Sequence, residues 1–515
     1  MKLLERISVL NWFTRIGLAL VGGLSSSLAF PRENLSPIII VSVVALFLSV
    51  YQLKVVPAFV IGFIGGLSFY LSQIEWMSLY LGPVPWIALS TLEAFIFAVG
   101  MSAVAFVWRG LSSAKLPKHF GPAIISLSLA TIWTAREWVS ISLPYGGFPW
   151  SRLAQTQSDT FLAKWVYWGG LGLLTFVLAF ISASVAVVIV GRVKLRSPGM
   201  IPVFGFVLLS LAVPALTQID PGAQTGTIRV GAVQGNANAG LFANPERGSI
   251  LKNHLDASKG LDKGALDVVV WPENASDLSP YSDQSANRLI TDFVDNQIGV
   301  PLIFGTITQR GESLYNSSIL WRPGLGATDW YDKKRPVPFA EYVPDRDFWY
   351  QLAPDLIGLV NRGYEFGERD GIFEIDKAKL GALICFEIAI DDIGRDLVQS
   401  GAQVILSQTN NADFGRSDQT FQQAAFARLR AIETGRTVVN VSTVGVSAIF
   451  NADGSVVSQL PTFEAGVMQQ EVPLRDSITP AMAIGSWFDL FINFAASLIL
   501  LLTLRLILTR RNRSL

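Results

Sequence analysis

Apolar residues are concentrated in long runs in the first part of the chain, up to about residue 217, and again over 484–508. Between these parts, apolar and polar residues are mixed as in soluble domains. A bilayer-spanning helix needs roughly 20 mostly apolar residues, and about seven runs before the mixed region and one after it approach this length. The pattern predicts a polytopic α-helical membrane protein with an inserted domain of soluble composition. The expected spans are roughly 14–31, 36–53, 55–74, 85–108, 121–142, 161–191, 199–217 and 484–508.

The composition also indicates a membrane protein. Half of the 515 residues are apolar and only 16% are charged, which is outside the range of ordinary soluble domains. A cleaved signal peptide is an alternative for the first apolar run. The charged residues Lys2, Glu5, Arg6 and Arg15 precede the run and more spans follow it, so we expect it to remain as an uncleaved helix.

Basic residues fall mainly in alternate loops between the predicted spans. Cytoplasmic loops carry an excess of lysine and arginine, so the richer loops are assigned to the cytoplasm. Seven spans before the mixed region then put that region outside the cytoplasm, and the eighth span returns the tail. The opposite loops hold chiefly Arg32, Arg152 and Lys164. The basic residues assigned to the cytoplasm are Lys2, Arg6, Arg15, Lys54, Arg109, Lys115, Lys118, Arg192, Lys194, Arg196, Arg510, Arg511 and Arg513.

These expectations divide the chain into three segments. Residues 1–217 form an N-terminal membrane domain, residues 218–480 an extracytoplasmic domain, and residues 481–515 a last membrane helix with a basic cytoplasmic tail. Within the spans, Glu93 and the Arg136–Glu137 pair are costly in hydrocarbon, so they are either functional or a structural bridge near the interface. The formal net charge is zero, which gives no indication of nucleic-acid binding.

From Thr227 the pattern changes to short strand-like runs with helical stretches between them. The clearest helix covers Gln419–Thr434 and is followed by Gly435, a residue typical of helix C-caps. Strands that alternate with helices over about 250 residues predict one α/β domain. The periodicity alone also allows a doubly wound sheet. The strand-like runs are 228–233, 266–271, 300–306, 316–321, 380–385, 404–407 and 438–441.

Cys385 is the only cysteine of the chain and ends one of these strand-like runs. A single thiol excludes an internal disulfide and a cysteine metal cluster, so a functional Cys385 would be a nucleophile. A buried structural thiol is the alternative. The two histidines, His119 and His254, belong to no motif, so we expect the base to be a carboxylate.

Two further segments supply the groups that such a nucleophile needs. Glu273 follows an apolar strand, so it lies at a carboxyl end, where the catalytic groups of α/β sheets gather. The adjacent Lys333 and Lys334 precede Glu341, and neighbours in an extended chain face opposite sides, which leaves open which lysine points inward. A surface basic pair is the alternative. Glu341 and Glu387 are either salt-bridge partners or groups that orient the lysine.

The order Glu273, Lys333 and Cys385 resembles the catalytic set of the nitrilase (carbon–nitrogen hydrolase) superfamily. With several spans before this domain and one after it, nearly the whole chain resembles the apolipoprotein N-acyltransferase family. The segments that carry the resemblance are 146–150, 233–236, 338–344, 431–436 and 442–447. Departures from the family pattern are Pro336, Ala340, the segment 410–415, and Phe242 and Ala243 where many members carry a tryptophan nearby.

The resemblance implies an α-β-β-α sandwich and a role for each motif residue. Glu273 corresponds to the base, Cys385 to the nucleophile and Lys333, which stands eight positions before Glu341, to the oxyanion donor in preference to Lys334. Glu341 and Glu387 correspond to supporting acids. Substrate contacts are expected from Phe148, Trp150, Phe242, Tyr342 and Phe386.

The resemblance also implies the reaction and the location. An enzyme of this family in the bacterial cytoplasmic (inner) membrane passes an acyl chain from a phospholipid, through a cysteine thioester, to the α-amine of the diacylglyceryl cysteine of an apolipoprotein. The expected partners are therefore the bilayer, the phospholipid donor and the apolipoprotein acceptor. We expect a monomer, no nucleic acid, no metal and no cofactor. The alternatives are a membrane-anchored nitrilase or amidase for small nitriles or amides, and a non-enzymatic membrane scaffold.

Overall fold

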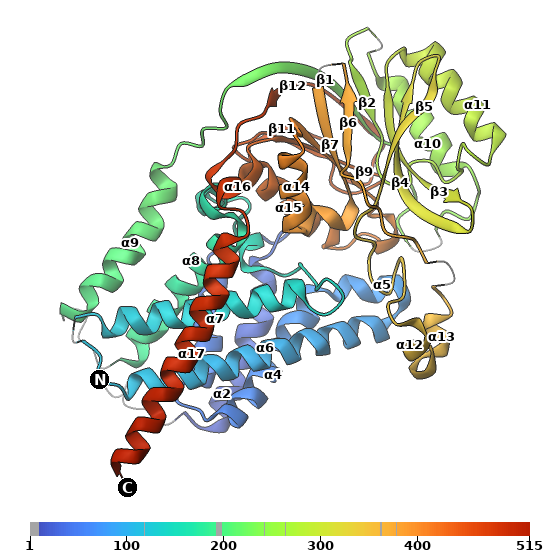
Figure 1. Cartoon of the computed structure of the whole chain (residues 1–515). Helices are drawn as coiled ribbons and strands as arrows, with labels where there is room; N and C mark the ends of the chain where they lie inside the picture. Colours follow the sequence, from blue (N-terminus) through green and yellow to red (C-terminus); the bar gives the residue numbers. More distant parts are fainter. Residues whose placement is uncertain are drawn as a thin grey trace. The chain divides into compact units, whose positions relative to one another are not determined.

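The computed structural model describes residues 10–117, 119–191, 198–240, 243–262, 264–360, 363–376 and 378–514. The chain forms two compact units (Figure 1), a helical unit of Met1–Ser78, Gly82–Gln218 and Ile484–Leu515 and an α/β unit of Leu79–Leu81 and Ile219–Ala483. The predictions for Phe242 and for the basic residues Lys2, Arg6, Lys118, Arg192, Lys194 and Arg196 concern residues outside the described ranges.

The helical unit places a helix in each of the eight predicted apolar runs. Five described helical stretches are long and apolar enough to cross a bilayer, judged by length and composition: Val55–Gln73, Pro83–Ser112, Phe161–Val190, Pro198–Leu216 and Trp487–Arg510. Helix Ile38–Val50 is apolar but shorter, so the total of eight spans stays a prediction. The helices are α2 (Trp12–Ser25), α3 (Ile38–Val50), α4 (Val55–Gln73), α6 (Pro83–Ser112), α7 (Gly121–Ser142), α8 (Trp165–Val190), α9 (Ile201–Leu216) and α17 (Trp487–Ser514).

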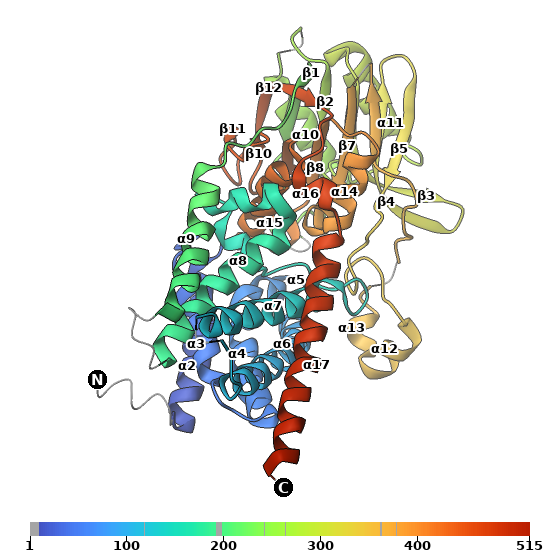
Figure 2. The ribbon, with the colours of Figure 1, turned by 60° about the vertical axis from the view of Figure 1, so that its left-hand side comes forward.

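Helix α17 joins this unit from the far end of the sequence. It packs against α6 and α7 (Figures 1 and 2). The approach is close at Gly110 of α6, where an added Cβ would collide with the Thr503 methyl group of α17. Small residues let membrane helices approach in this way, because packing rather than the hydrophobic effect drives their association.

Buried polar side chains connect the membrane helices. Glu137 of α7 accepts hydrogen bonds from Thr175 Oγ1 of α8 at 2.7 Å and from Arg152 Nε at 3.3 Å. The Arg136 guanidinium lies 4.7 Å from the ring centroids of both Phe97 and Trp133. These contacts give the charged pair a role in holding helices together, which favours the structural alternative over a functional one.

The α/β unit contains two six-stranded sheets. The first has the order β12-β1-β2-β3-β4-β5 and the second the order β11-β10-β9-β8-β7-β6. Strands β1, β2 and β3 are parallel neighbours in the first sheet, and β7, β8 and β9 in the second. The strands are β1 (Gln224–Gln234), β2 (Val268–Val270), β3 (Leu302–Arg310), β4 (Ser313–Arg322), β5 (Gly326–Asp332), β6 (Ile372–Ile375), β7 (Ala378–Ile384), β8 (Val404–Thr409), β9 (Thr437–Ser442), β10 (Ala448–Phe450), β11 (Val456–Gln459) and β12 (Gly466–Arg475).

The sheets pack face to face and are covered by helices on their outer faces (Figures 1 and 2). One core cluster lies between the sheets and joins Val230 and Val270 of the first sheet to Leu380 and Val439 of the second. Another joins the outer face of the first sheet to α10 (Ser249–Ala257) and α11 (Gln284–Asp292). Helices α14 (Asp391–Gln399) and α15 (Gln419–Thr434) contact β7 and β9 of the second sheet. The predicted α-β-β-α sandwich is therefore confirmed, and the doubly wound alternative is wrong.

Candidate active site

Cys385 begins a sharp turn directly after β7. The strand ends at Ile384, and the 3-10 helix Cys385–Ala389 follows without a linker. Cys385 has a φ of 54°, in the left-handed region that is uncommon for residues other than glycine. Such backbone conformations concentrate at functional sites, where the surrounding contacts hold them in place. The thiol is consequently presented at the carboxyl end of a central strand.

Glu387 holds this turn and the neighbouring lysine segment together. Its fully buried carboxylate accepts hydrogen bonds from the Ile384 amide at 2.8 Å and from the Lys334 amide at 2.7 Å. The Tyr331 hydroxyl of β5 donates to the same carboxylate at 2.9 Å. Burial raises the pKa of Glu387, and the Ile384 amide opposes the rise. Glu387 therefore fixes the backbone next to Cys385 and next to Lys333, rather than meeting the substrate.

The two adjacent lysines point to different environments. The Lys333 side chain is 1% exposed, and its Nζ lies 2.8 Å from Glu341 Oε2 and 3.4 Å from Glu273 Oε1. Lys334 Nζ instead lies 2.6 Å from Asp370 Oδ1, in a pair with 22% and 37% of the side chains exposed. The structure thus places Lys333 in the site and Lys334 at the surface, where the strand pattern alone left both possible.

Glu273 reaches the site from a loop that other segments support closely. It follows β2 and is buried beside Gly305 of β3, where an added Cβ would lie 2.6 Å from Glu273 Cα. Gln408 of β8 donates from Nε2 to the Trp271 carbonyl at 2.6 Å and accepts from Ser318 Oγ of β4 at 2.6 Å. The side chain of Gln408 therefore links the two sheets beside the Glu273 loop.

Asn316 of β4 joins the two carboxylates that flank the lysine. Its Nδ2 donates to Glu273 Oε1 at 2.7 Å and to Glu341 Oε1 at 2.8 Å. Its carbonyl accepts from the Lys333 amide at 2.9 Å. We did not single out Asn316 from the sequence. The available signal was a polar residue at the start of a strand that was otherwise expected to be buried.

Burial and charge pairing set the protonation of the three central groups. Burial raises the pKa of the Cys385 thiol to about 12, and the Glu273 carboxylate adds to the rise while Lys333 opposes it. Burial also raises the pKa of Glu273, against the effect of Lys333. For Lys333, burial disfavours the charge, but the carboxylates of Glu341 and Glu273 overcome it and raise the pKa. At neutral pH the lysine is therefore an ammonium and the cysteine a thiol, and Glu273 is the neighbouring acid–base group that can exchange a proton with this thiol.

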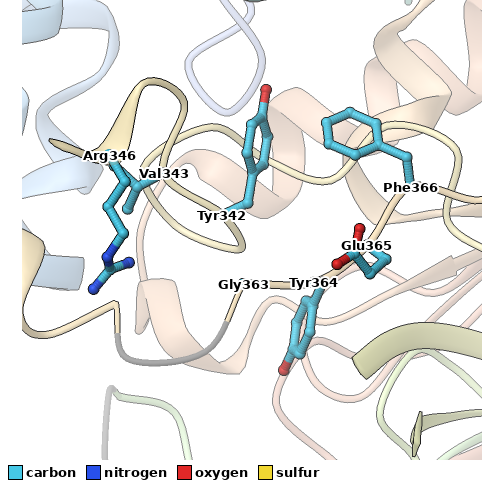
Figure 3. Close-up of a pocket in the computed structure, with 7 residues that line it drawn as sticks. All are labelled: Tyr342, Val343, Arg346, Gly363, Tyr364, Glu365 and Phe366. Carbon is cyan, nitrogen blue, oxygen red and sulfur yellow. The ribbon is translucent and has the colours of Figure 1, made fainter. Parts of the chain in front are cut away.

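A cavity of about 410 Å³ opens between the segment that follows Glu341 in the sequence and the segment around Tyr364 (Figure 3). The Tyr364 amide in its wall donates to the Glu341 carbonyl at 2.8 Å, which ties the cavity to the site. The rings of Tyr342 and Phe366 meet edge to face with centroids 4.8 Å apart. The cavity is lined by Tyr342, Val343, Arg346, Gly363, Tyr364, Glu365 and Phe366.

The remaining predicted substrate contacts have different surroundings. Tyr342 lines the cavity, and Phe386 follows the nucleophile and is half-buried. In the helical unit, Trp150 is buried and packs with Phe148 at 6.4 Å and Trp76 at 5.6 Å between ring centroids. Phe242 lies outside the described residues. Within the described ranges, no group of three or more His, Cys, Asp or Glu side chains is arranged to hold a metal ion.

Both units match known family models. The model described as the apolipoprotein N-acyltransferase N-terminal domain matches residues 22–184, and the model described as carbon-nitrogen hydrolase matches residues 229–479. Among solved structures, an amidase from Nesterenkonia sp. is similar, with 17% identity, a TM-score of 0.37, and coverage of 51% of this chain and 96% of the amidase.

Three relatives that match most of the chain are named apolipoprotein N-acyltransferase. The protein of Mycolicibacterium smegmatis is 29% identical over 86% of this chain and 77% of its own length. The protein of Photobacterium profundum is 27% identical over 96% of this chain and 95% of its own length. The protein of Pseudomonas syringae pv. tomato is 27% identical over 93% of this chain and 96% of its own length. The chain, with its apolar helices, its sandwich and its cysteine site, belongs to the apolipoprotein N-acyltransferase family.

Proposed function

We propose that this protein transfers an acyl chain from a membrane phospholipid to the N-terminal α-amine of apolipoproteins. The observation that carries the proposal is the meeting of the buried Glu273 and Lys333 with the half-buried Cys385 in one cluster. Nζ of Lys333 lies 3.4 Å from Glu273 Oε1, and the Cys385 thiol interacts with the same carboxylate. The family match over both units supports the choice of substrates.

In the first half-reaction, Glu273 takes the proton of the Cys385 thiol as the sulfur attacks an ester carbonyl of the phospholipid. The carbon–sulfur bond forms and the carbonyl electron pair moves to oxygen. When this oxyanion collapses, the carbon–oxygen ester bond breaks, and Glu273 returns the proton to the departing lysophospholipid. A thioester on Cys385 remains. A raised pKa suits Glu273 to the first proton transfer, because it makes the carboxylate a stronger base.

Lys333 is the group that meets the oxyanion. Its ammonium is fixed by Glu341 and Glu273 at 2.8 Å and 3.4 Å, so no reorganisation is needed as negative charge develops. Asn316 donates a hydrogen bond to each of the two carboxylates. Glu341 is thus a positioning residue that keeps the lysine charged and in place.

In the second half-reaction, the neutral α-amine of the diacylglyceryl cysteine attacks the thioester. Glu273 accepts a proton from the attacking nitrogen, the carbon–sulfur bond breaks, and the amide forms. The Cys385 thiolate then recovers its proton from Glu273. The two half-reactions share one acyl-enzyme, so the kinetics are ping-pong.

A membrane-anchored amidase uses similar residue types but has no need of the rest of this chain. One anchoring helix would suffice for such an enzyme, whereas the helical unit matches the N-terminal domain of the N-acyltransferases over residues 22–184. Ammonia release from small amides, without transfer to a lipopeptide, is the outcome that would favour the amidase.

The donor is a phospholipid and the acceptor a lipid-modified protein, which explains a catalytic domain joined to apolar helices. The distribution of lysine and arginine supports an orientation in which residues 218–480 face the extracytoplasmic side of a bacterial inner membrane. We further propose that Tyr342 and the cavity it lines contact the substrate, because Tyr342 directly follows Glu341 and the Tyr364 amide in the cavity wall donates to the Glu341 carbonyl at 2.8 Å. A monomer contains all the residues that this mechanism uses.

Replacing the nucleophile tests the proposed reaction directly. We expect Cys385→Ala to insert and fold but to transfer no acyl chain to a diacylated lipopeptide, and Cys385→Ser to keep at most a trace, because a serine hydroxyl is far harder to deprotonate. The measurement is acyl transfer from phospholipid vesicles to the lipopeptide by mass spectrometry. A wild-type melting temperature of the variants serves as the folding control. Transfer by the alanine variant at the wild-type rate would remove Cys385 from the mechanism.

The adjacent lysines provide a matched pair of substitutions. Lys333→Ala should slow thioester formation about a hundred-fold or more, as losses of single oxyanion donors do. Lys333→Arg should not restore the rate, because a planar guanidinium does not fit the place of a compact ammonium. Lys334→Ala should stay within a few-fold of wild type, since exposed ion pairs contribute only about 0.2–1 kcal/mol. The measurement is the rate of acyl-enzyme formation for each variant. A large loss confined to Lys334→Ala would contradict the assignment of Lys333 as the oxyanion donor.

Cysteine labelling tests the orientation, because the chain has no other cysteine once Cys385→Ala is introduced. In this background, Glu312→Cys lies in an exposed turn of the α/β unit, and Ser514→Cys lies in the basic tail. We expect a membrane-impermeant maleimide to label Glu312→Cys on intact spheroplasts, and Ser514→Cys only after the membrane is disrupted. The reverse pattern would put the catalytic domain in the cytoplasm.

A further inference from the structure

A chain of buried amide side chains ends at the Cys385 sulfur. Gln423 of α15 is 1% exposed, and its Nε2 lies 3.5 Å from Cys385 Sγ. Its other neighbours, Gln419 on the same helix and Asn411 in the loop after β8, are buried as well. Neither Gln423 nor this network has a role in the proton transfers or the oxyanion site described above.

The hydrogen bonds of Gln423 fix which end of its amide faces the sulfur. Its Oε1 accepts from Asn411 Nδ2 at 2.6 Å and from Gln419 Nε2 at 3.0 Å. Two donors therefore hold the oxygen on the side away from Cys385. The NH₂ group is left to point at the sulfur, as a donor rather than an acceptor.

The orientation of Asn411 is set in turn by a main-chain group. The Val446 amide donates to Thr420 Oγ1 at 2.8 Å, and Thr420 Oγ1 donates to Asn411 Oδ1 at 3.3 Å. A main-chain N–H can only donate, so the threonine hydroxyl accepts from it and has its own hydrogen free for Asn411. Ser442 Oγ donates to the same Asn411 oxygen at 2.6 Å. The direction of donation thus runs from the Val446 amide through Thr420, Asn411 and Gln423 to the sulfur.

We propose that Gln423 stabilises the Cys385 thiolate by donating a hydrogen bond to its sulfur in both half-reactions, and that Asn411 is the positioning residue that keeps Gln423 in the donor orientation. The inference rests on the proposed role of Cys385 as the nucleophile. Two groups then meet the negative charge: Lys333 at the oxygen of the tetrahedral intermediate, and Gln423 at the sulfur as it loses its proton and again when the thioester breaks.

The charged groups around Cys385 show how a neutral donor such as Gln423 would affect the pKa of the thiol. The ionised side chains that act on the thiol are the carboxylates of Glu273 and Glu341, which raise its pKa, and the Lys333 ammonium, which lowers it. Lys333 is already shared between those carboxylates at 2.8 and 3.4 Å. Gln423 adds a neutral donor that also lowers the pKa of the thiol and brings no further carboxylate or ammonium into the site.

The network also accounts for segments that the mechanism left unused. Asn411 lies in the segment 410–415, which departs from the family pattern, and Ser442 lies in the motif 442–447. Ser447 of that motif donates to Gln234 Oε1 at 2.6 Å, and Gln234 Nε2 donates to the Glu464 carbonyl at 2.8 Å. Through Ser442 and Asn411, this motif is therefore connected to Gln423 and the nucleophile.

Alkylation of Cys385 by iodoacetamide as a function of pH tests the inference, and the reaction is specific because the chain has one cysteine. Gln423→Glu keeps the shape of the side chain but replaces the donor with oxygens, and Gln423→Met removes the donor at similar volume. We expect both to move the pH profile of alkylation to higher pH, Gln423→Glu further. Acyl-enzyme formation should fall about ten- to hundred-fold, the range for hydrogen bonds to charged groups.

Asn411→Asp tests the proposed direction of donation, because it removes the donor that holds the Gln423 oxygen. It should shift the alkylation profile in the same direction as Gln423→Met, and the double variant should shift it no further than Gln423→Met alone. Gln403→Glu is the matched control, since Gln403 precedes β8 at the end opposite Asn411 and the substitution adds the same charge. It should leave both measurements unchanged.

A merely structural Gln423 would lower the melting temperature without moving the pH profile, and this result overturns the inference. An unchanged profile in Gln423→Met overturns it even if Gln423→Glu does not fold. Because alkylation needs no lipid substrate, a shifted profile in a protein that transfers no acyl chain would leave this inference standing and reject the proposed function.

Discussion

The site depends on keeping one ammonium group charged in the interior of the α/β sandwich. Transfer of an ammonium from water into a protein interior costs several kcal/mol unless it is paired and hydrogen-bonded. Lys333 meets this condition through Glu341 and Glu273, and Asn316 ties the two carboxylates together. Removal of both carboxylates would leave the ammonium as an uncompensated buried charge. Residues at the surrounding strand ends therefore supply the charges and hydrogen bonds that this ammonium requires.

Two backbone features follow from that constraint. The Glu273 loop approaches β3 so closely that only a glycine fits at position 305. On the other side, Glu387 binds the amides of Ile384 and Lys334 with one carboxylate, so the nucleophile turn and the lysine segment share a support. In the proposed mechanism, the three glutamates therefore have different roles: Glu273 exchanges protons, Glu341 positions the lysine, and Glu387 positions the backbone.

Much of this organisation was predictable from the sequence, because it depends on local patterns. Long apolar runs marked the helices, and Gly435 marked the end of α15, where its φ of 67° is left-handed. The pattern could not distinguish Lys333 from Lys334; the motif spacing favoured Lys333. Asn316 and Gln423 were missed because their importance comes from contacts between segments that are distant in the sequence. Gln423 and Cys385, for example, are 38 positions apart. The strands β5, β6, β10, β11 and β12 were also missed.

The proposed mechanism uses the two kinds of donor for different atoms. A charged lysine suits an oxyanion that appears only briefly, whereas a neutral amide suits a sulfur that is alternately a thiol, a thioester and a thiolate. The apolar helices serve a separate need, since both the acyl donor and the acceptor are held in a bilayer. In this account the sandwich carries out the chemistry and the helices hold the substrates, which explains why family models match both units.

The central claim is that one acyl group passes through Cys385 on its way from phospholipid to lipopeptide. The most direct measurement incubates the wild-type protein with vesicles of a phospholipid whose acyl chain is isotopically labelled, removes the lipid, and follows the labelled mass by peptide mass spectrometry. The account predicts that the label appears on the peptide containing Cys385 as a hydroxylamine-sensitive thioester. When an unlabelled diacylated lipopeptide is then added, the labelled acyl chain should leave this peptide and appear on the lipopeptide as an amide. Label that reaches the lipopeptide without ever appearing on Cys385, or that stays on Cys385 through the chase, would contradict it.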